Sequence, residues 1–499
     1  MATKKNVIVI GSGFAGLSAA SFMAKAGWDV TVIEKNNTPG GRARQLKEQG
    51  FTFDIGPSFY WMPDVFDRYF AQFGKKTADY YHLHRLEPSY RIYWDSGYSD
   101  LPADYEALQE LFNSIEPGSG QKLDKYLKGA AYKYEVGVNN LVYKPSRSIT
   151  EFMDWKTISG VFKLQVFSSI KKHIAHYFTH PKLRQIMEFP VLFLGALPQD
   201  TPALYSLMNY ADIKGGTWYP DSITKEGTSG MYAVVEGMYT LAKELGVQFH
   251  LSENALEIKV EKGIAQQVIT DKGIYNADVV ISGADYHFTE TTLLPQKYQS
   301  YTNAYWQKKV MAPSCLLYYV GLNKKLQNLQ HHSLFFDVPF EQHGKEIYTN
   351  PAWPSQPLFY VSIASLTDKK VAPEGGENLV FLVPIAAGLQ NDTTAIREKY
   401  FQQIVERFEK HIGQSIKEAI VVKHTYSVSD FVNDYNSFKG NAYGLANTLL
   451  QTAIFRPSCK SKKVKNLFYT GQLTVPGPGV PPSLISGEVV ANEVLKHSN

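Results

Sequence analysis

The chain has 499 residues, of which 44% are hydrophobic, 20% charged and 13% aromatic. This composition excludes a mainly disordered protein, and the length is sufficient for about three domains with a large core. The net charge of +4 is too small to indicate a nucleic-acid partner, and Cys315 and Cys459 are expected to be free thiols in a reducing compartment.

The first 75 residues are expected to form a strand, a glycine turn, a helix and a second strand. The apolar run 7–10 predicts the first strand, 14–25 the helix and 29–34 the second strand. The uncharged stretch 6–24 superficially resembles a signal peptide or a membrane span, but three glycines interrupt it. We therefore expect a protein that is soluble or lies on a membrane surface.

This opening contains a dinucleotide-binding fingerprint in the required order of elements. Gly11 permits a tight turn, Gly13 allows the backbone to approach a pyrophosphate, and Gly16 allows close packing of helix and strand. The positive end of the helix would hold the phosphate charge. Glu34, at the end of the second strand, is expected to accept hydrogen bonds from ribose hydroxyls. A structural glycine-rich turn is the alternative.

The rest of the chain alternates between helical and strand-rich stretches. Residues 100–200 are expected to be mostly helical, and residues 247–283 to form short strands with turns at Lys262-Gly263 and Lys272-Gly273. Further strands are predicted at 315–320, 358–363, 379–384 and 466–470, and helices at 394–411 and 483–496. Because both ends of the chain contain a strand, a glycine turn and a helix, we expect a nucleotide domain assembled from separated pieces.

Two stretches near the N-terminus resemble the flavin-binding signature of the amine-oxidase-like flavoprotein superfamily. These are residues 39–44, Pro-Gly-Gly-Arg-Ala-Arg, and residues 53–58, Phe-Asp-Ile-Gly-Pro-Ser. In that superfamily the paired glycines approach the flavin and the following arginine, here Arg42, reaches the pyrophosphate. At the C-terminus, residues 466–487 form a strand, a Gly/Pro turn and a helix whose positive end would face the flavin ring.

Four internal segments add to these motifs, namely residues 216–220, 234–238, 439–445 and 455–457. With them, the sequence resembles the bacterial-type carotenoid (phytoene) desaturase family over essentially the whole chain. One departure is the stretch 221–229, which lies before Gly230-Met231 and lengthens the loop that usually joins these segments. This insertion leaves the identity of the substrate open.

The resemblance implies FAD as cofactor and assigns site residues. The implied cofactor-binding residues are Gly11, Gly13, Phe14, Ala15, Gly16, Glu34, Lys35, Gly41, Arg42, Gly56, Pro57, Ser58, Ala255, Gly471, Val480, Pro481 and Ser483. The implied substrate-channel residues are Arg184, Trp218 and Tyr443, although a solvated helix face is an equal alternative for Arg184. No catalytic acid or base and no metal site is assigned, because desaturation needs chiefly hydride transfer to the flavin and an apolar tunnel. The pair His331-His332 is interpreted as a surface loop.

The expected fold is α/β, with three parts. A discontinuous Rossmann-like FAD-binding domain comprises 1–75, 221–295 and 458–499; a mixed β-sheet substrate domain comprises 76–135 and 296–457; and a helical, membrane-facing cap comprises 136–220. The basic and aromatic stretch 155–184 fits either a helix in the lipid headgroup layer or an ordinary core-facing helix. Lys460, Lys462, Lys463 and Lys465 are interpreted as a solvated loop.

The resemblance implies an FAD-dependent desaturase that introduces C=C bonds into a carotenoid. Two reactions remain open: phytoene-type desaturation, or 3,4-desaturation of a hydroxylated carotenoid. A flavin amine or protoporphyrinogen-type oxidase would be a different enzyme on this fold, and a prenyl or polyene carrier would use the fold without catalysis. We expect oxygen or a quinone as electron acceptor, no bound nicotinamide, and a cytoplasmic protein held peripherally at the inner face of the membrane.

Overall fold

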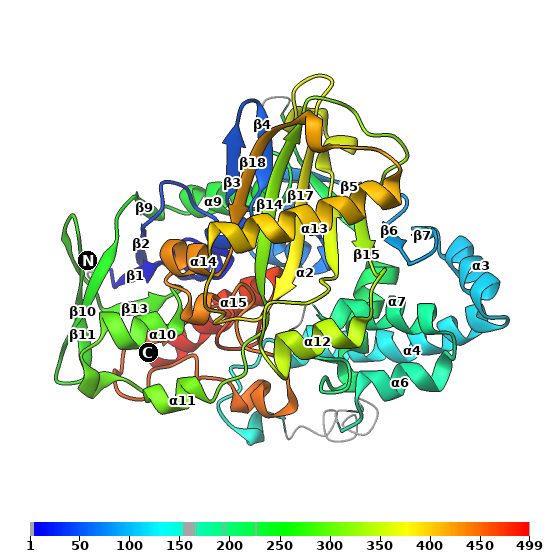
Figure 1. Cartoon of the computed structure of the whole chain (residues 1–499). Helices are drawn as coiled ribbons and strands as arrows, with labels where there is room; N and C mark the ends of the chain where they lie inside the picture. Colours follow the sequence, from blue (N-terminus) through cyan, green and yellow to red (C-terminus); the bar gives the residue numbers. More distant parts are fainter. Residues whose placement is uncertain (1–3, 153–164, 166, 193–194, 225–226, 499) are drawn as a thin grey trace.

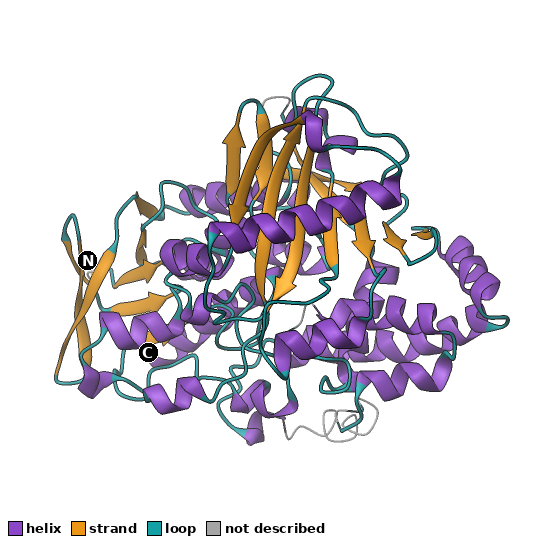
Figure 2. Ribbon diagram, viewed as in Figure 1, coloured by secondary structure: helices purple, strands orange, loops and turns teal. Residues whose placement is uncertain are grey.

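The computed structural model describes residues 4–152, 165, 167–192, 195–224 and 227–498. Two large sheets organise the chain, and helices gather around them (Figures 1 and 2). Figure 1 shows the first sheet at the left, near both termini, and the second at the top centre behind helix α13. The chain therefore has the α/β architecture predicted from its sequence.

The first sheet is parallel and has the strand order β19-β13-β1-β2-β9. Its strands are β1 (Asn6–Ile10), β2 (Asp29–Glu34), β9 (Gln248–Leu251), β13 (Val279–Ser282) and β19 (Leu467–Tyr469). The central strands β1 and β13 are apolar because both faces of the sheet are covered: Val7 and Val9 share a core cluster with Leu17, and Ile8 and Ile10 share another with Ile258 and Val268. This sheet brings together three stretches of the chain that are far apart in sequence.

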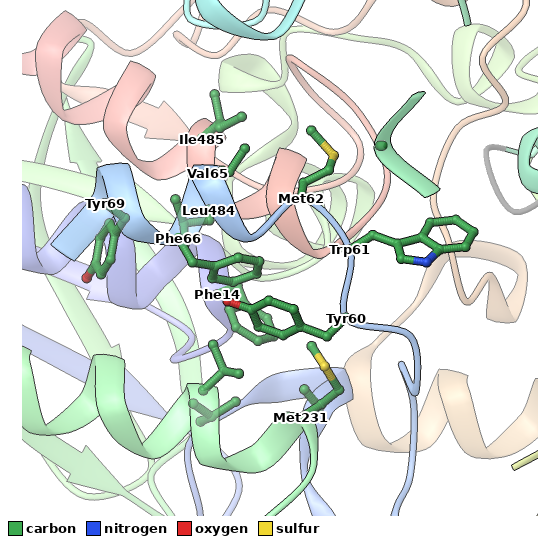
Figure 3. Packing of buried hydrophobic residues seen from close by; sticks show 14 of the residues in the cluster. Phe14, Tyr60, Trp61, Met62, Val65, Phe66, Tyr69, Met231, Leu484 and Ile485 are labelled. Carbon is green, nitrogen blue, oxygen red and sulfur yellow. The ribbon is translucent and has the colours of Figure 1, made fainter. Parts of the chain in front are cut away.

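Helices α1 (Phe14–Lys25), α9 (Met231–Glu244) and α15 (Val480–Ser498) pack against this sheet or one another. The bounds of α1 and β2 are those predicted from the sequence. A Cβ atom at Gly487 of α15 would lie 2.5 Å from the Ala15 carbonyl oxygen, so glycine allows α15 to approach α1 closely. Figure 3 shows the adjoining core, where Phe14, Phe66, Met231 and Leu484 converge from four helices.

The second sheet is mixed and has the strand order β18-β14-β17-β16-β15-β6-β7. All neighbouring pairs are antiparallel except β15 and β6. Its strands are β6 (Tyr90–Tyr93), β7 (Tyr98–Leu101), β14 (Ser314–Leu322), β15 (His332–Phe335), β16 (Phe359–Ser362), β17 (Glu377–Ile385) and β18 (Ile420–Tyr426). Helix α13 (Thr394–Ile412) contributes Phe401, Ile404 and Phe408 to the core on one face.

Shorter strands and further helices surround the two large sheets. The remaining strands are β3 (Gln45–Glu48), β4 (Phe51–Asp54), β5 (Tyr81–Arg85), β8 (Trp218–Ser222), β10 (Ala255–Glu261), β11 (Ile264–Thr270) and β12 (Ile274–Asn276). The remaining helices include α2 (Pro63–Ala71), α3 (Tyr105–Ile115), α4 (Ser119–Val136), α6 (Ile170–Tyr177), α7 (Pro181–Leu192), α8 (Leu207–Tyr210), α10 (Tyr286–Phe288), α11 (Asn303–Gln307), α12 (Phe340–Tyr348) and α14 (Val428–Tyr435). The predicted turns at 262–263 and 272–273 separate β10, β11 and β12.

The predicted basic amphipathic stretch 155–184 lies only partly within the described residues. Residues 155–164 and 166 lie outside them. In α6, Ile170 and Ile174 are fully buried while Lys171 and Lys172 are exposed, which is the pattern of a core-facing helix with a solvated basic face. Over the described ranges, no helix is both long and apolar enough to cross a bilayer.

Candidate functional site

A cavity of about 270 Å³ lies at the carboxyl ends of the parallel strands. This is the edge at which open α/β sheets bind ligands. Many of the predicted cofactor-binding residues line it, namely Gly11, Gly13, Phe14, Ala15, Gly16, Glu34, Lys35, Gly41, Arg42, Gly56, Pro57, Ala255, Gly471, Val480 and Ser483. Ser58 instead lines a small polar cavity near His331, and Pro481 lies in the first turn of α15 without lining this cavity. We call the large cavity the cofactor cavity.

The turn between β1 and α1 depends on its glycines. Gly11 has φ +92°, a conformation that side chains rarely adopt, and a Cβ atom at Gly16 would lie 2.0 Å from the Gly11 carbonyl oxygen. The first turn of α1 therefore lies directly against the strand. Residues 13–16 line the cofactor cavity, and the free backbone N–H groups of a helix N-terminus favour an anionic group there.

Glu34 ends β2 with a buried carboxylate that is fully hydrogen-bonded. One carboxylate oxygen accepts hydrogen bonds from the backbone N–H and the hydroxyl of Ser12, both at 2.8 Å. The other accepts from the backbone N–H of Asn36 at 2.9 Å and from its side-chain amide at 2.8 Å. These four bonds use the roughly four lone-pair positions of a carboxylate. A ribose hydroxyl can therefore bind Glu34 only when the Ser12 hydroxyl or the Asn36 amide rotates away.

Arg42 carries a positive charge that is only partly compensated. Its Nη2 donates to the Ser437 hydroxyl at 3.0 Å and to the Asn441 carbonyl at 3.3 Å, whereas its Nε is shielded from solvent and has no partner. Burial lowers the pKa of Arg42, and the negative charge of Asp285 opposes this shift. Because a buried charge is costly without a partner, the site suits an anionic ligand.

The residues that line the cofactor cavity but were not predicted from the sequence include two notable groups. Gly283, Ala284 and Asp285 directly follow β13, so their place at the carboxyl end of a parallel strand was a usable signal. The second group is Phe431 and the stretch 434–436. These residues come from α14 and the turn after it, which follow strand β18 of the mixed sheet. No motif in the sequence indicates that α14 reaches this cavity.

A second cavity, of about 60 Å³, adjoins the cofactor cavity, and we call it the apolar cavity. It is lined by Phe189, Pro313, Leu334, Phe336, Phe340, His343, Gly344, Ile347, Tyr348, Leu358, Phe359, Tyr360, Leu382, Pro384 and Tyr443. Leu382 and Tyr443 line both cavities. No lining residue is an Asp, Glu, Lys or Arg, so this space suits a hydrocarbon better than an ion.

Three polar side chains lie near the junction of the two cavities. The Tyr443 hydroxyl and the Cys315 thiol lie close enough together to interact, and Tyr348 lies close enough to both for an electrostatic interaction. The Tyr348 hydroxyl is buried and has no hydrogen-bond partner. Burial raises the pKa of Cys315 to about 12 and that of both tyrosines well above its usual value. The junction is therefore uncharged at neutral pH.

The interpretation of His331-His332 as a surface loop is wrong, because both side chains are buried where β15 begins. His332 lies 2.6 Å from the Tyr360 hydroxyl through Nδ1 and stacks on Phe59 with ring centroids 4.0 Å apart. Burial lowers the pKa of His331 to about 3 and that of His332 well below its usual value, so both rings are neutral. Across the described residues, no group of three or more potential metal ligands occurs.

The other two predicted channel residues do not line either cavity. Arg184 lies in α7, and its Nε donates to the Phe178 carbonyl at 2.8 Å. Trp218 begins β8, where the Arg85 guanidinium lies 5.2 Å from its ring centroid. Of the three, only Tyr443 lies at the junction.

The family model described as "Flavin containing amine oxidoreductase" matches residues 14–495. The chain belongs to this family. It is a flavin-dependent oxidoreductase with FAD as its cofactor, as its motifs predicted. The predicted resemblance to carotenoid desaturases is also confirmed by relatives that match almost the whole chain.

Two curated relatives and one solved structure illustrate the place of this flavoprotein in the family. It is 40% identical over 495 residues to a carotenoid 3,4-desaturase of Haloarcula japonica, covering 99% of this chain and 98% of that protein. It is 28% identical to a zeta-carotene-forming phytoene desaturase of Myxococcus xanthus, covering 98% and 94%. A solved oxidoreductase of Methanosarcina mazei covers 98% of this chain and 100% of that chain with a TM-score of 0.63 and 15% identity, a likeness that shows the fold alone.

Proposed function

We propose that this flavoprotein is a carotenoid desaturase. The observation that carries the proposal is the meeting of the cofactor cavity with an uncharged, aromatic-rich cavity at Leu382 and Tyr443. The two desaturase relatives support the same conclusion. An amine oxidase would need to accommodate an ammonium group, and the apolar cavity offers no carboxylate to pair with one.

The cofactor cavity fits FAD because some of its polar side chains lack a hydrogen-bond partner or can exchange their present partner for the cofactor. Glu34 would bind the ribose hydroxyls after the Ser12 or Asn36 side chain rotates, and the unpartnered Nε of Arg42 would face the pyrophosphate. The first turn of α15, near Val480 and Ser483, would direct its positive end at the flavin ring. Ala255 would contact the adenine through its backbone.

When bound, FAD supplies a hydride acceptor, while the chain controls the surroundings of the reacting carbons. The residues of the apolar cavity would exclude water and contact a short segment of the polyene next to the junction. The neutral thiol of Cys315 and the hydroxyl of Tyr443 border the junction without introducing a charge. This arrangement needs no strong base, because a cation in the substrate delocalises along the polyene.

For the choice of substrate, 3,4-desaturation of a hydroxylated carotenoid is better supported than phytoene-type desaturation. The Haloarcula relative has the higher identity of the two desaturases. The unpartnered hydroxyl of Tyr348 also supports a substrate with one oxygen atom, because burying a hydroxyl without a partner costs about 1–3 kcal/mol. Tyr348→Phe should therefore lower the ratio of kcat/KM for a hydroxylated carotenoid to that for the matched hydrocarbon by at least tenfold.

The proposal includes the domain division and the cellular setting expected from the sequence. The parallel sheet takes its strands from 1–75, 221–295 and 458–499, and the mixed sheet takes its strands from 76–135 and 296–457. We assign the first set to the FAD domain, the second to the substrate domain and 136–220 to a helical cap. Oxygen or a quinone accepts the electrons, and the protein associates peripherally with the membrane that dissolves the substrate.

The test incubates FAD-loaded protein with hydroxylated carotenoid, hydrocarbon carotenoid or polyamine, each in separate vesicle suspensions. A desaturase lengthens the conjugated system of a carotenoid, which is read by chromatography and absorption. Oxidation of the polyamine alone would show an amine oxidase. Protein that contains no FAD and binds the polyene without altering it chemically would indicate a non-catalytic carrier.

A further inference from the structure

Four exposed apolar side chains gather on one surface, which we call the apolar patch. Leu450 is 72% exposed, Phe455 50%, Val310 44% and Leu449 41%. Leu449 and Phe455 lie in the short 3-10 turns Leu449–Gln451 and Ala453–Phe455, and Val310 follows α11. Figure 1 shows these turns in orange at the lower edge of the molecule, beside α11. Single exposed apolar residues are ordinary, but a contiguous group indicates an interaction surface.

Hydrogen bonds join the two segments that form the apolar patch. The Val310 backbone N–H donates to the Gln451 side-chain oxygen at 3.0 Å, and the Gln451 amide donates to the Val310 carbonyl at 2.8 Å. The ammonium group of Lys309 lies 3.5 Å from the Phe455 carbonyl oxygen. The patch is therefore one surface held in a fixed arrangement.

The same two segments lead from the apolar patch to the wall of the apolar cavity. The Ala446 N–H donates to the Val310 carbonyl at 3.1 Å, and the Ala312 N–H donates to the Gly444 carbonyl at 2.8 Å. One residue beyond these contacts, Pro313 and Tyr443 line the apolar cavity. Pro313 follows Val310 by three positions, an extended reach of about 10 Å. The patch thus lies a short distance from the cavity proposed for the polyene.

Positive charge and tyrosine rings border the apolar patch. Lys309 lies 4.5 Å from the ring centroid of Tyr305, and Lys462 lies 4.3 Å from that of Tyr301. Lys308 is exposed beside them. Stretches 303–310 and 442–465 contain no Asp or Glu. Proteins that bind the surface of an anionic membrane place apolar side chains toward the acyl chains and lysine and tyrosine side chains at the headgroups. The apolar patch and its surroundings have this arrangement.

We propose that the apolar patch docks on an anionic lipid bilayer and places the apolar cavity within reach of the acyl region. This inference rests on the proposed function, since a polyene dissolves in the bilayer and not in water. It assigns membrane contact to residues 308–310 and 449–455, whereas α6, within stretch 155–184, buries Ile170 and Ile174; of the described residues in that stretch, Phe167 is exposed and lies just before α6. Leu449, Leu450, Phe455 and Val310 enter the interface, and Lys308, Lys309 and Lys462 contact the headgroups.

The test measures vesicle partition of the FAD-loaded full chain by flotation. The probes are vesicles of phosphatidylcholine alone and vesicles that also contain phosphatidylglycerol. A triple variant carries Leu449→Ser, Leu450→Ser and Phe455→Ser. A matched control carries Ile223→Ser and Ile274→Ser, which alter exposed residues outside the patch. FAD content and unfolding temperature check that each variant is folded.

We expect wild-type protein to prefer the anionic vesicles and the triple variant to show a partition coefficient at least tenfold lower. The control should match wild type, and Lys308→Gln with Lys309→Gln should reduce the preference for anionic lipid several-fold. The assignment would be overturned if wild-type protein bound neither kind of vesicle, or if the triple variant had the same partition coefficient as wild type.

A second readout separates this inference from the proposed function. It is the ratio of the desaturation rate with vesicle-held carotenoid to the rate with detergent-dispersed carotenoid. The ratio should fall at least tenfold in the triple variant but not in the control, and an unchanged ratio would contradict the docking role of the patch. Wild-type protein that desaturates no carotenoid in detergent would contradict the proposed function, while the flotation result would still test the patch.

Discussion

Tyr443 lies beside the thiol of Cys315 at the point where the cofactor cavity meets the apolar cavity. Cys315 lies on β14 of the mixed sheet, and Tyr443 lies in a segment between that sheet and the C-terminal strand β19. Burial keeps both groups protonated, so the contact positions the two segments without adding charge. In the proposed function, a substrate passes this junction to reach the flavin.

Obstructing the junction should separate substrate oxidation from cofactor binding. Leu382 lines both cavities and is almost fully buried on β17. Leu382→Trp should lower kcat/KM for a carotenoid at least tenfold because the larger side chain fills the passage, while the protein still retains FAD. Leu382→Met, which nearly conserves volume, is the control. Normal turnover by an FAD-replete Leu382→Trp protein would show that the substrate takes another route.

Removing the charge of Arg42 should weaken FAD binding. The proposed contact with the pyrophosphate is a charge-assisted hydrogen bond, so Arg42→Gln should raise the Kd for FAD about tenfold to hundredfold. The Kd is measured by titrating apoprotein with FAD and following flavin fluorescence. Arg184→Gln is the control, because Arg184 lines neither cavity. Equal affinity of the Arg42 variant and wild type would exclude the proposed contact.

The close approach of α1 and α15 should be sensitive to one added methyl group. A Cβ atom at Gly487 would lie 2.5 Å from both the Ala15 carbonyl oxygen and the Ser18 Cβ, so Gly487→Ala should lower the free energy of unfolding by about 3 kcal/mol. At Gly129 in α4 nothing lies within 4 Å of the added atom, so Gly129→Ala should instead stabilise the protein by about 0.5–1 kcal/mol. Denaturant unfolding measures both, and a Gly487→Ala protein as stable as wild type would contradict this packing.

Asp54 should make stability depend on pH. Its carboxylate accepts a hydrogen bond from the Met231 N–H at the start of α9, and burial raises its pKa from 3.8 to about 6. Because the folded-state pKa is raised, the stability that protonated Asp54 contributes is complete below about pH 4 and is lost as pH rises through about 6.

The comparison of wild type with Asp54→Asn isolates this effect, because the variant cannot ionise at this position. As the pH rises from 4 to 6, the free energy of unfolding of the wild type should fall relative to that of the variant, by an amount on the order of 2 kcal/mol. Unfolding curves at a series of pH values measure the difference. A constant difference across this range would show that Asp54 titrates normally.

Motifs and periodicity among neighbouring residues predicted the N-terminal part of the cofactor site. Contacts between residues that are far apart in the sequence could not be predicted. The glycine fingerprint and the apolar periodicity placed α1 and β2 with their observed bounds, because both depend on interactions between neighbours in sequence. His331-His332 was misassigned because its burial depends on Phe59 and Tyr360, which are far away in the chain. The approach of Tyr435 to the cofactor cavity likewise depends on where α14 lies after β18 of the mixed sheet, which no pattern among neighbouring residues indicates.

Carotenoid desaturation by this flavoprotein is tested most directly in a single-turnover experiment without oxygen. FAD-loaded protein is mixed with a hydroxylated carotenoid in vesicles, and the flavin absorption is followed together with that of the polyene. We predict that about one flavin is reduced for each double bond formed. A flavin that stays oxidised while the carotenoid remains unchanged, in protein that a polyamine readily reduces, would contradict the proposed function.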